Sequence, residues 1–108
     1  MPTFLVSGSY TPEGVRGVAA EGAASRQQVI AGLAQHLGGE LVAAYWTTGG
    51  PDHFHVIVTA PAGSDLAALW LTVDGSGGAR VNSVTELLTA AELDAARAKT
   101  PGYRAPGQ

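Results

Sequence analysis

The sequence predicts a single α+β domain in which helices cover one side of a four-stranded antiparallel sheet. Three observations favour this class. The chain has 108 residues, of which 45% are apolar and 14% are charged, so it has enough apolar material for one core. Four short segments have strand-like composition, and the segments between them show helical spacing of apolar residues. The resulting order, β-α-β-β-α-β-α, is that of the ferredoxin-like split β-α-β fold.

The first strand is predicted at residues 3–10, TFLVSGSY, which are rich in β-branched and aromatic residues. Thr11 is expected to cap a helix that starts at Pro12, because proline lacks the N–H that is left unpaired at the first helical position. Gly22 should break or bend this helical region. Apolar residues recur on one face of its second part, which Gly38-Gly39 should end.

The second and third strands are predicted at residues 40–48 and 53–60, with the turn Gly49-Gly50-Pro51-Asp52 between them. Ser64 is expected to cap the next helix. That helix should end in the glycine-rich stretch 75–78, which lacks the lysine and the spacing of a phosphate-binding loop.

The C-terminal part is predicted to hold a fourth strand, from about residue 79 to residue 88, and a short helix. Thr89-Ala90-Ala91-Glu92 has the spacing of a capping box, in which the first and last side chains each accept the other residue's backbone N–H. This helix should end near Lys99. No repeat or linker interrupts the chain, so we expect residues 1–99 to form one domain and residues 100–108 a loose tail.

Composition and charge exclude several classes of protein. The net charge of −3 and the lack of a basic run argue against a nucleic-acid partner, because contacts to phosphate backbones need clustered lysine and arginine. The chain has no cysteine, which excludes disulfides and thiol chemistry. There is no positively charged leader and no long apolar run, so we expect neither a signal peptide nor a membrane span. We therefore expect a cytoplasmic protein with no membrane partner.

The sheet face away from the helices is expected to mix apolar and polar side chains. A turn of two or four residues sets the register of strands two and three and places Trp46 opposite His55 on this face. The expected members are the cross-strand pairs Thr48–His53, Trp46–His55 and Ala44–Ile57, with Val42 on strand two and Leu5, Ser7 and Ser9 on strand one. The same register turns Phe54, Val56, Val58, Tyr45 and Ala43 toward the helices.

A sheet face of this composition is too apolar to stay exposed and too polar for an ordinary core. We expect a second copy of the chain to cover it, so that two sheets face one another around a partly polar lumen. The expected assembly is a homodimer or a higher homo-oligomer. Its lumen is the expected site of a small-molecule ligand.

His53 and His55 occupy alternate positions of strand three, and three interpretations of the pair remain open. As catalytic acid/base residues they would move protons on a ligand in the lumen, since imidazole titrates near neutral pH. As metal ligands they would bind a divalent transition metal such as zinc, copper, nickel or iron, because alternate strand residues point the same way. In the third interpretation both histidines bond to backbone or to the partner subunit.

The proton-transfer interpretation would suit isomerisation, cyclisation or decarboxylation of an apolar or aromatic metabolite, without a cofactor. In a non-catalytic binding or structural module the same pocket would only hold its occupant. Besides the histidines, the expected ligand-binding residues are Trp46 and Ile57 as apolar walls, Ser7, Ser9 and Thr48 as hydrogen-bonding groups, and Asp52 beside His53.

Several local motifs resemble the GYD-domain family over roughly residues 2–93. They are MPTFLV at the start, SYTPEGV at residues 9–15, Ala60-Pro61 after strand three, and Ala79-Arg80-Val81 in strand four. The family is similar to dimeric α/β-barrel proteins, which implies a ferredoxin-like protomer paired sheet to sheet. Related barrels include cofactor-independent monooxygenases, isomerases, cyclases, haem-dependent enzymes and proteins that only bind ligands. The resemblance therefore implies a fold rather than a reaction.

The chain departs from the motif that names this family. Counting back from Ala60-Pro61 places Gly-x-Tyr-Asp on Gly50-Pro51-Asp52-His53, where only the glycine is kept. A one-residue insertion or deletion would instead retain Asp52 as the family aspartate. In either alignment His53 and His55 are additions that the family pattern does not explain.

Overall fold

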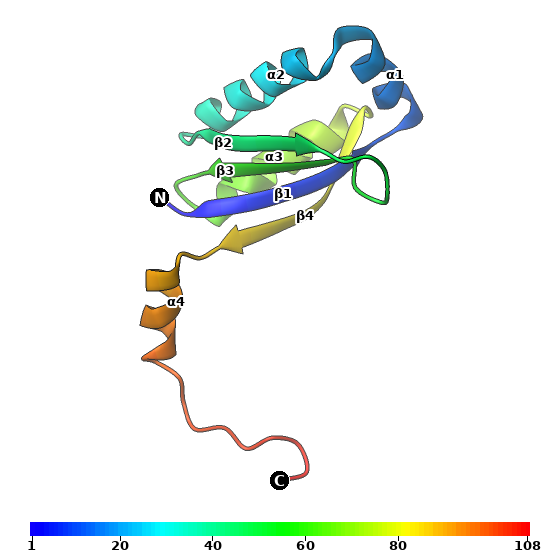
Figure 1. Ribbon diagram of the computed structural model, residues 1–108. Coiled ribbons are helices and arrows are strands. Elements are labelled where there is room, and N and C mark those ends of the chain that lie inside the picture. Colours follow the sequence, from blue (N-terminus) through cyan, green and yellow to red (C-terminus); the bar gives the residue numbers. More distant parts are fainter.

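The computed structural model describes residues 1–108 and contains one four-stranded sheet with helices against one face (Figure 1). The strands are β1 (Thr3–Tyr10), β2 (Leu41–Trp46), β3 (Phe54–Thr59) and β4 (Ala79–Leu87). Their spatial order is β2-β3-β1-β4, and every neighbouring pair is antiparallel. This arrangement confirms the predicted ferredoxin-like α+β class.

Local capping chemistry explains where the first helices begin and end. The helices are α1 (Pro12–Glu21), α2 (Ala23–His36), α3 (Leu66–Gly75) and α4 (Ala90–Arg97). The Thr11 hydroxyl accepts the Gly14 N–H at 3.1 Å, as predicted for the cap of α1. Gly22 separates α1 from α2 with a φ of 89°, a value that glycine adopts easily. No helix combines the length and apolarity needed to cross a bilayer.

The prediction that Ser64 caps the third helix is wrong. Ser64 lies inside a short 3-10 helix, η1 (Gly63–Asp65), which leads directly into α3. The carboxylate of Asp65 accepts the backbone N–H of Ala62 at 3.1 Å and so holds the start of this turn. The acidic residue, rather than the serine, therefore supplies the side-chain acceptor.

The predicted register of β2 and β3 is also wrong, by one residue. Trp46 lies opposite Phe54, and Tyr45 lies opposite His55. The reason is the turn, which closes where the Thr47 N–H donates to the His53 carbonyl at 3.0 Å and therefore has an odd number of residues, 48–52. Because side chains alternate between faces, this one-residue change exchanges the faces of all β2 side chains near the turn.

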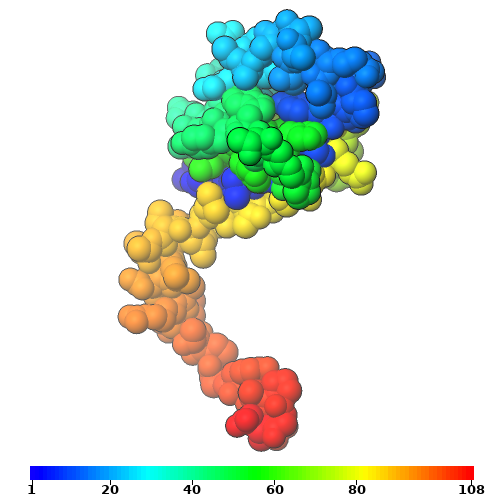
Figure 2. All heavy atoms as spheres, turned by 45° about the vertical axis from the view of Figure 1, so that its right-hand side comes forward, coloured from blue at the N-terminus to red at the C-terminus, as the bar shows by residue number.

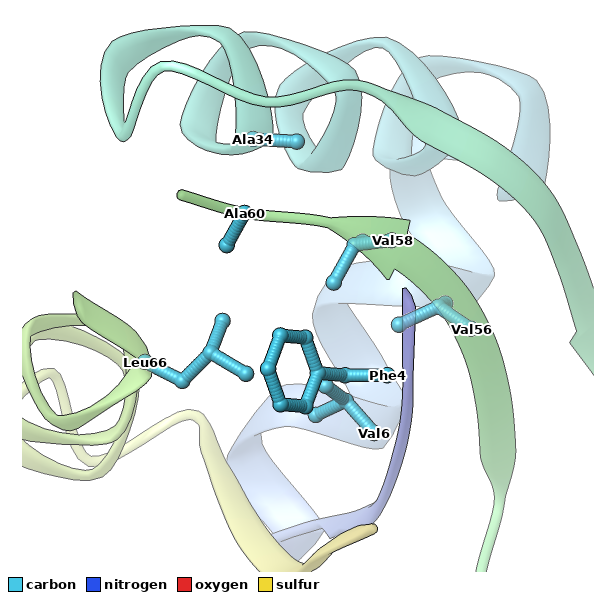
Figure 3. Close-up of a cluster of buried hydrophobic side chains, with 7 residues drawn as sticks. All are labelled: Phe4, Val6, Ala34, Val56, Val58, Ala60 and Leu66. Atoms are coloured by element: carbon cyan, nitrogen blue, oxygen red, sulfur yellow. The ribbon is translucent and has the colours of Figure 1, made fainter. Parts of the chain in front are cut away.

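The core lies between the sheet and the helices. Figure 3 shows the side chains of β1 and β3 meeting one residue from α2 and one from α3. Val6 is the most central of the large side chains, with 1% of its surface exposed. The cluster consists of Phe4, Val6, Ala34, Val56, Val58, Ala60 and Leu66. Val56 and Val58 thus face the helices as predicted, whereas Tyr45 and Ala43 do not.

Both outer strands of the sheet contain an irregularity. In β2 the pairing with β3 shifts between Leu41 and Ala43, so Val42 has no partner. In β4, Ser83 pairs with Ser7 of β1 and Val81 pairs with the next residue, Gly8. Asn82, between them, is therefore the extra residue. Each outer strand therefore carries a β-bulge.

Helix α4 and the C-terminal tail project away from the sheet and the other helices (Figures 1 and 2). No residue of α4 is buried. The radius of gyration is 16.9 Å, compared with about 13 Å for a compact domain of roughly 100 residues. The extended arm accounts for this difference in shape.

Candidate functional site

The sheet face away from α2 and α3, here called the open face, is organised as two cross-strand rows. One row holds Ala43, Ile57, Leu5 and Thr85, and the next holds Tyr45, His55, Ser7 and Ser83. The first row is largely apolar. The second is polar except for the ring of Tyr45, which has 65% of its surface exposed. The open face therefore pairs an apolar strip with a hydrogen-bonding strip.

Ser7 and His55 form a hydrogen bond at the centre of this face. The Ser7 hydroxyl oxygen and Nδ1 of His55 are 2.6 Å apart, and Ser7 is only 3% exposed. The hydroxyl forms no other hydrogen bond, so its proton is satisfied only if it donates to Nδ1. We therefore assign the proton of neutral His55 to Nε2.

The second ring nitrogen of His55 has no hydrogen-bond partner within the chain. The ring is partly exposed, so Nε2 can meet a group from outside. In the other neutral form, with the proton on Nδ1, the Ser7 hydroxyl accepts this proton and its own proton has no partner in the chain. In that form Nε2 carries a lone pair, and the nitrogen can act as a base.

His53 is engaged differently. It precedes the first residue of β3, and its Nδ1 accepts the backbone N–H of Tyr10 at 2.8 Å. Its ring stacks on the ring of Tyr10, with centroids 5.9 Å apart and planes 10° from parallel. The backbone N–H of His53 donates to the Gly8 carbonyl at 2.7 Å. These contacts fasten the β2–β3 loop to the end of β1.

Trp46 lies with this aromatic group and not beside His55. Its register partner is Phe54, so it lies on the helix side of the sheet. Its indole N–H donates to the hydroxyl of Tyr10 at 3.0 Å, and Tyr10 also packs on Phe54 with ring centroids 5.2 Å apart. The position predicted for Trp46 on the open face is occupied by Tyr45. Thr48 is exposed in the turn and has no partner across the sheet.

Asp52 and Ser9 are joined by a residue that sequence reasoning missed. The side-chain amide of Asn82 donates to Oδ1 of Asp52 at 2.8 Å and to the Ser9 hydroxyl at 3.2 Å. The Asp52 carbonyl also accepts the hydroxyl of Thr47 at 2.7 Å. Asn82 can reach both partners because it is the extra residue of the β4 bulge, which no local pattern in the sequence indicates.

The histidines are not part of a larger group of potential metal ligands. No three His, Asp or Glu side chains lie close enough together to hold a metal ion. His36, the third histidine, is the last residue of α2 and is exposed. Within one chain, His53 and His55 therefore offer at most two ligands.

A cavity lies on the other side of the sheet. It has a volume of about 360 Å³ and is bounded by α1, α2, the end of α3 and the start of β4. None of the site residues expected from the sequence lines it. One sequence signal was present but unused, namely the pair Gly14 and Gly17, which places two residues without side chains one turn apart on α1.

Comparison with known proteins gives a family and no closer relative. The profile of the GYD domain matches residues 4–96, a span that runs from β1 into α4. Comparisons with curated proteins and with solved structures return no significant match. With most of its length matched, including every strand of the sheet, this chain belongs to the GYD-domain family.

Proposed function

We propose that two copies of the chain pair through their open faces and bind a small, partly apolar organic molecule between them, with His55 transferring a proton to or from it. The observation that carries this proposal is the Ser7–His55 hydrogen bond, which engages Nδ1 and leaves Nε2 without a partner in the chain. His53 supports the site indirectly, since its Nδ1 is occupied by the Tyr10 backbone.

The apolar strip of the open face supports pairing between copies. Leu5, Ile57 and Ala43 share this strip, and Tyr45 stands beside it with most of its ring in water. No helix of the chain covers these residues, and a contiguous apolar surface of this kind favours an interface. A second copy would bury the strip and exclude water from the Ser7–His55 pair.

The Ser7–His55 pair supports proton transfer at a ligand. With its proton on Nε2, His55 donates a hydrogen bond to a carbonyl oxygen and stabilises the negative charge that forms when an adjacent C–H bond breaks. With its proton on Nδ1, it accepts a proton at Nε2. The Ser7 hydroxyl donates to Nδ1 in the first form and accepts from it in the second, in which its own proton is left without a partner in the chain. Isomerisation, cyclisation and decarboxylation are reactions in which such a group can supply or remove a proton.

The pairing of open faces is tested by substituting a lysine on each of two surfaces. Ile57→Lys would bury an unpaired charge in the interface, so the dimer should weaken at least about a hundredfold while the protomer stays folded. Val15→Lys is the matched control, because Val15 is exposed and lies on α1, on the helix side of the sheet. Size-exclusion chromatography with light scattering gives both masses. The pairing is contradicted if the wild-type protein is still monomeric at roughly 100 μM. It is also contradicted if the two variants have equal masses.

The ligand is sought by native mass spectrometry and by crystallography of the purified protein, which identify any co-purified compound. Tyr45→Ala should weaken the binding of this compound, since the Tyr45 ring would border the proposed lumen. An enzyme should lose turnover by about a hundredfold or more in His55→Gln with a modest change in affinity, whereas a binding module should change in affinity alone. Ser7→Ala keeps the imidazole and releases its orientation, so it should lower turnover less than His55→Gln does.

Two results would replace the proposal. A near-stoichiometric metal that is lost in His55→Ala would assign this histidine to a metal site instead. Density that shows the two faces packed together by side chains alone would leave a structural or partner-binding module.

A further inference from the structure

We propose that the cavity on the helix side of the sheet is a second binding site, and that it takes a small monocarboxylic acid with an apolar body. It lies across the sheet from His55, so this proposal does not depend on the function of the open face. Its volume of about 360 Å³ falls within the range of roughly 300–1,000 Å³ that ligand pockets occupy.

The cavity exists because the helix layer is closed at one end and open at the other. Ala34, near the end of α2, and Leu66, at the start of α3, both belong to the buried cluster (Figure 3). The cavity is lined instead by Arg26, Val29 and Leu33 of α2 and by the last turns of α3. Gly17 of α1 borders it, and a Cβ atom added there would meet nothing within 4 Å. The space is therefore not filled by packing from this side.

The walls of the cavity are mainly apolar. Val18 of α1, Val29 and Leu33 of α2, and Val73 of α3 contribute side chains. Val29 has 43% of its surface exposed, although it lies on a helix that faces the sheet. A smaller apolar cavity of about 50 Å³ shares Leu33 and Val73 with the larger one and extends toward the sheet. An apolar ligand body would cover these side chains and remove their surface from water.

The free hydrogen-bond donors at this cavity are suited to an anion. Arg26 is its only basic residue, and the ion pair between its Nε and Oε1 of Glu21, at 3.4 Å, leaves the terminal guanidinium nitrogens for a second acceptor. The hydroxyl of Tyr10 accepts from Trp46 and donates to no other group in the chain.

The remaining hydroxyls at the cavity are already used. Those of Thr72 and Ser76 donate to backbone carbonyls of α3, at 2.9 and 2.6 Å. The unpaired donors therefore come from a guanidinium and a phenol. A carboxylate, which only accepts hydrogen bonds and which the guanidinium fork can hold with two of them, is the group that matches.

Glu21 competes with an anionic ligand for Arg26, so a substitution of Glu21 should change the affinity for that ligand. The Glu21 carboxylate is held by Arg26 and by the hydroxyl of Ser25, at 3.3 Å, and it competes with a ligand carboxylate for the guanidinium. Removing its charge should free Arg26 and tighten the binding of an anion. Glu21→Gln should therefore act in the direction opposite to Arg26→Met.

The test is a two-dimensional NMR titration of the full chain with octanoate, kept below its micelle-forming concentration, and with 1-octanol as the uncharged probe. Octanoate should shift the amide signals around Gly17, Val29 and Val73. Its dissociation constant should rise about tenfold or more in Arg26→Met, because hydrogen bonds to a charged group are lost. Arg16→Met, on the exposed surface of α1, is the matched control and should bind as the wild type does. The affinity for 1-octanol should not respond to Arg26→Met.

A second pair of variants tests the location. Gly17→Leu should fill the cavity and abolish the binding of both probes, whereas Gly32→Leu, which also has open space but lies outside the cavity, should not. The proposal is overturned if octanoate causes no shifts at millimolar concentration, if the shifts lie at Ser7 and His55, or if Arg26→Met binds it as well as the wild type. Should Arg26→Met fail to fold, Glu21→Gln decides, and an unchanged or weaker affinity there overturns the proposal.

Discussion

Two glycines one turn apart on α1 predict opposite effects for the same substitution. An added Cβ at Gly17 would meet no atom within 4 Å. At Gly14 it would overlap the backbone carbonyl of Gly78, where α1 approaches the start of β4. Neither glycine has a positive φ, so alanine fits the local backbone at both positions. The difference between the two variants therefore reports mainly the contact with Gly78, with a smaller contribution from the Cβ of Tyr10, 3.3 Å from the added atom.

The magnitudes follow from two opposing contributions. Alanine in place of glycine inside a helix adds about 0.5–1 kcal/mol of stability, chiefly by restricting the unfolded chain. Gly17→Ala should gain this amount. At Gly14 the added methyl must displace the Gly78 carbonyl, which also accepts the Thr11 N–H at 3.1 Å and its hydroxyl at 3.2 Å. Overpacking of this kind costs about 1–3 kcal/mol, so Gly14→Ala should be destabilised overall.

Urea and thermal unfolding followed by far-ultraviolet circular dichroism measure the difference. For a domain of this size, 1 kcal/mol corresponds to a change in Tm of roughly 5 °C. Gly17→Ala should therefore melt a few degrees above the wild type and Gly14→Ala below it. Gly32→Ala, at a third open position, should behave as Gly17→Ala does. If Gly14→Ala is as stable as Gly17→Ala, the close approach of α1 to Gly78 is not present in solution.

Three further predictions concern the core, the aromatic group and the projecting helix. Val6→Ala should cost about 2 kcal/mol, measured by urea unfolding, since Val6 is buried on all sides. Trp46→Phe should cost about 1 kcal/mol in the same assay, because it removes the hydrogen bond to Tyr10. Hydrogen bonds from the backbone and side chain of Thr89 lower the pKa of the Glu92 carboxyl. The lower pKa belongs to the folded state. The ionised carboxylate therefore contributes its full stabilisation at pH values above the ordinary pKa range of a carboxyl, and this stabilisation is lost as the pH falls through the lowered pKa. In the wild type, the helical NMR chemical shifts of residues 90–97 should decrease as the pH falls into the acid range. In Glu92→Gln, which lacks the titrating carboxyl, this decrease should be absent. The same pH dependence in both proteins would contradict the capping role.

The parts of the fold that depend on local chemistry were predictable from the sequence. Thr11 caps α1 and Thr89 caps α4 through the expected side-chain and backbone contacts, and Gly22 divides the helical region. The alternation of Val56 and Val58 also holds, because the buried side of a strand follows from its own pattern. Signals of this kind need only neighbouring residues to act.

Features that depend on the meeting of distant segments were not predictable in the same way. The number of residues in the β2–β3 turn decides whether Tyr45 or Trp46 faces the open side, and the turn sequence does not specify that number. The bond from the Tyr10 backbone to His53 joins two segments far apart in the chain, as does the contact of Asn82 with Asp52. The pairing of Ser7 with His55 was within reach, since both were expected at the centre of one face.

The bulges at Val42 and Asn82 restrict how the sheet can grow. A regular outer strand offers its free backbone N–H and C=O groups to any strand of another molecule, which is a route to fibrils and to strand exchange. Here β2 and β4 are the two outer strands, and each breaks the even spacing of those groups part-way along its length. An incoming strand would lose hydrogen bonds at either edge. The sheet is thereby protected against lateral addition of strands, while its open face stays available for association.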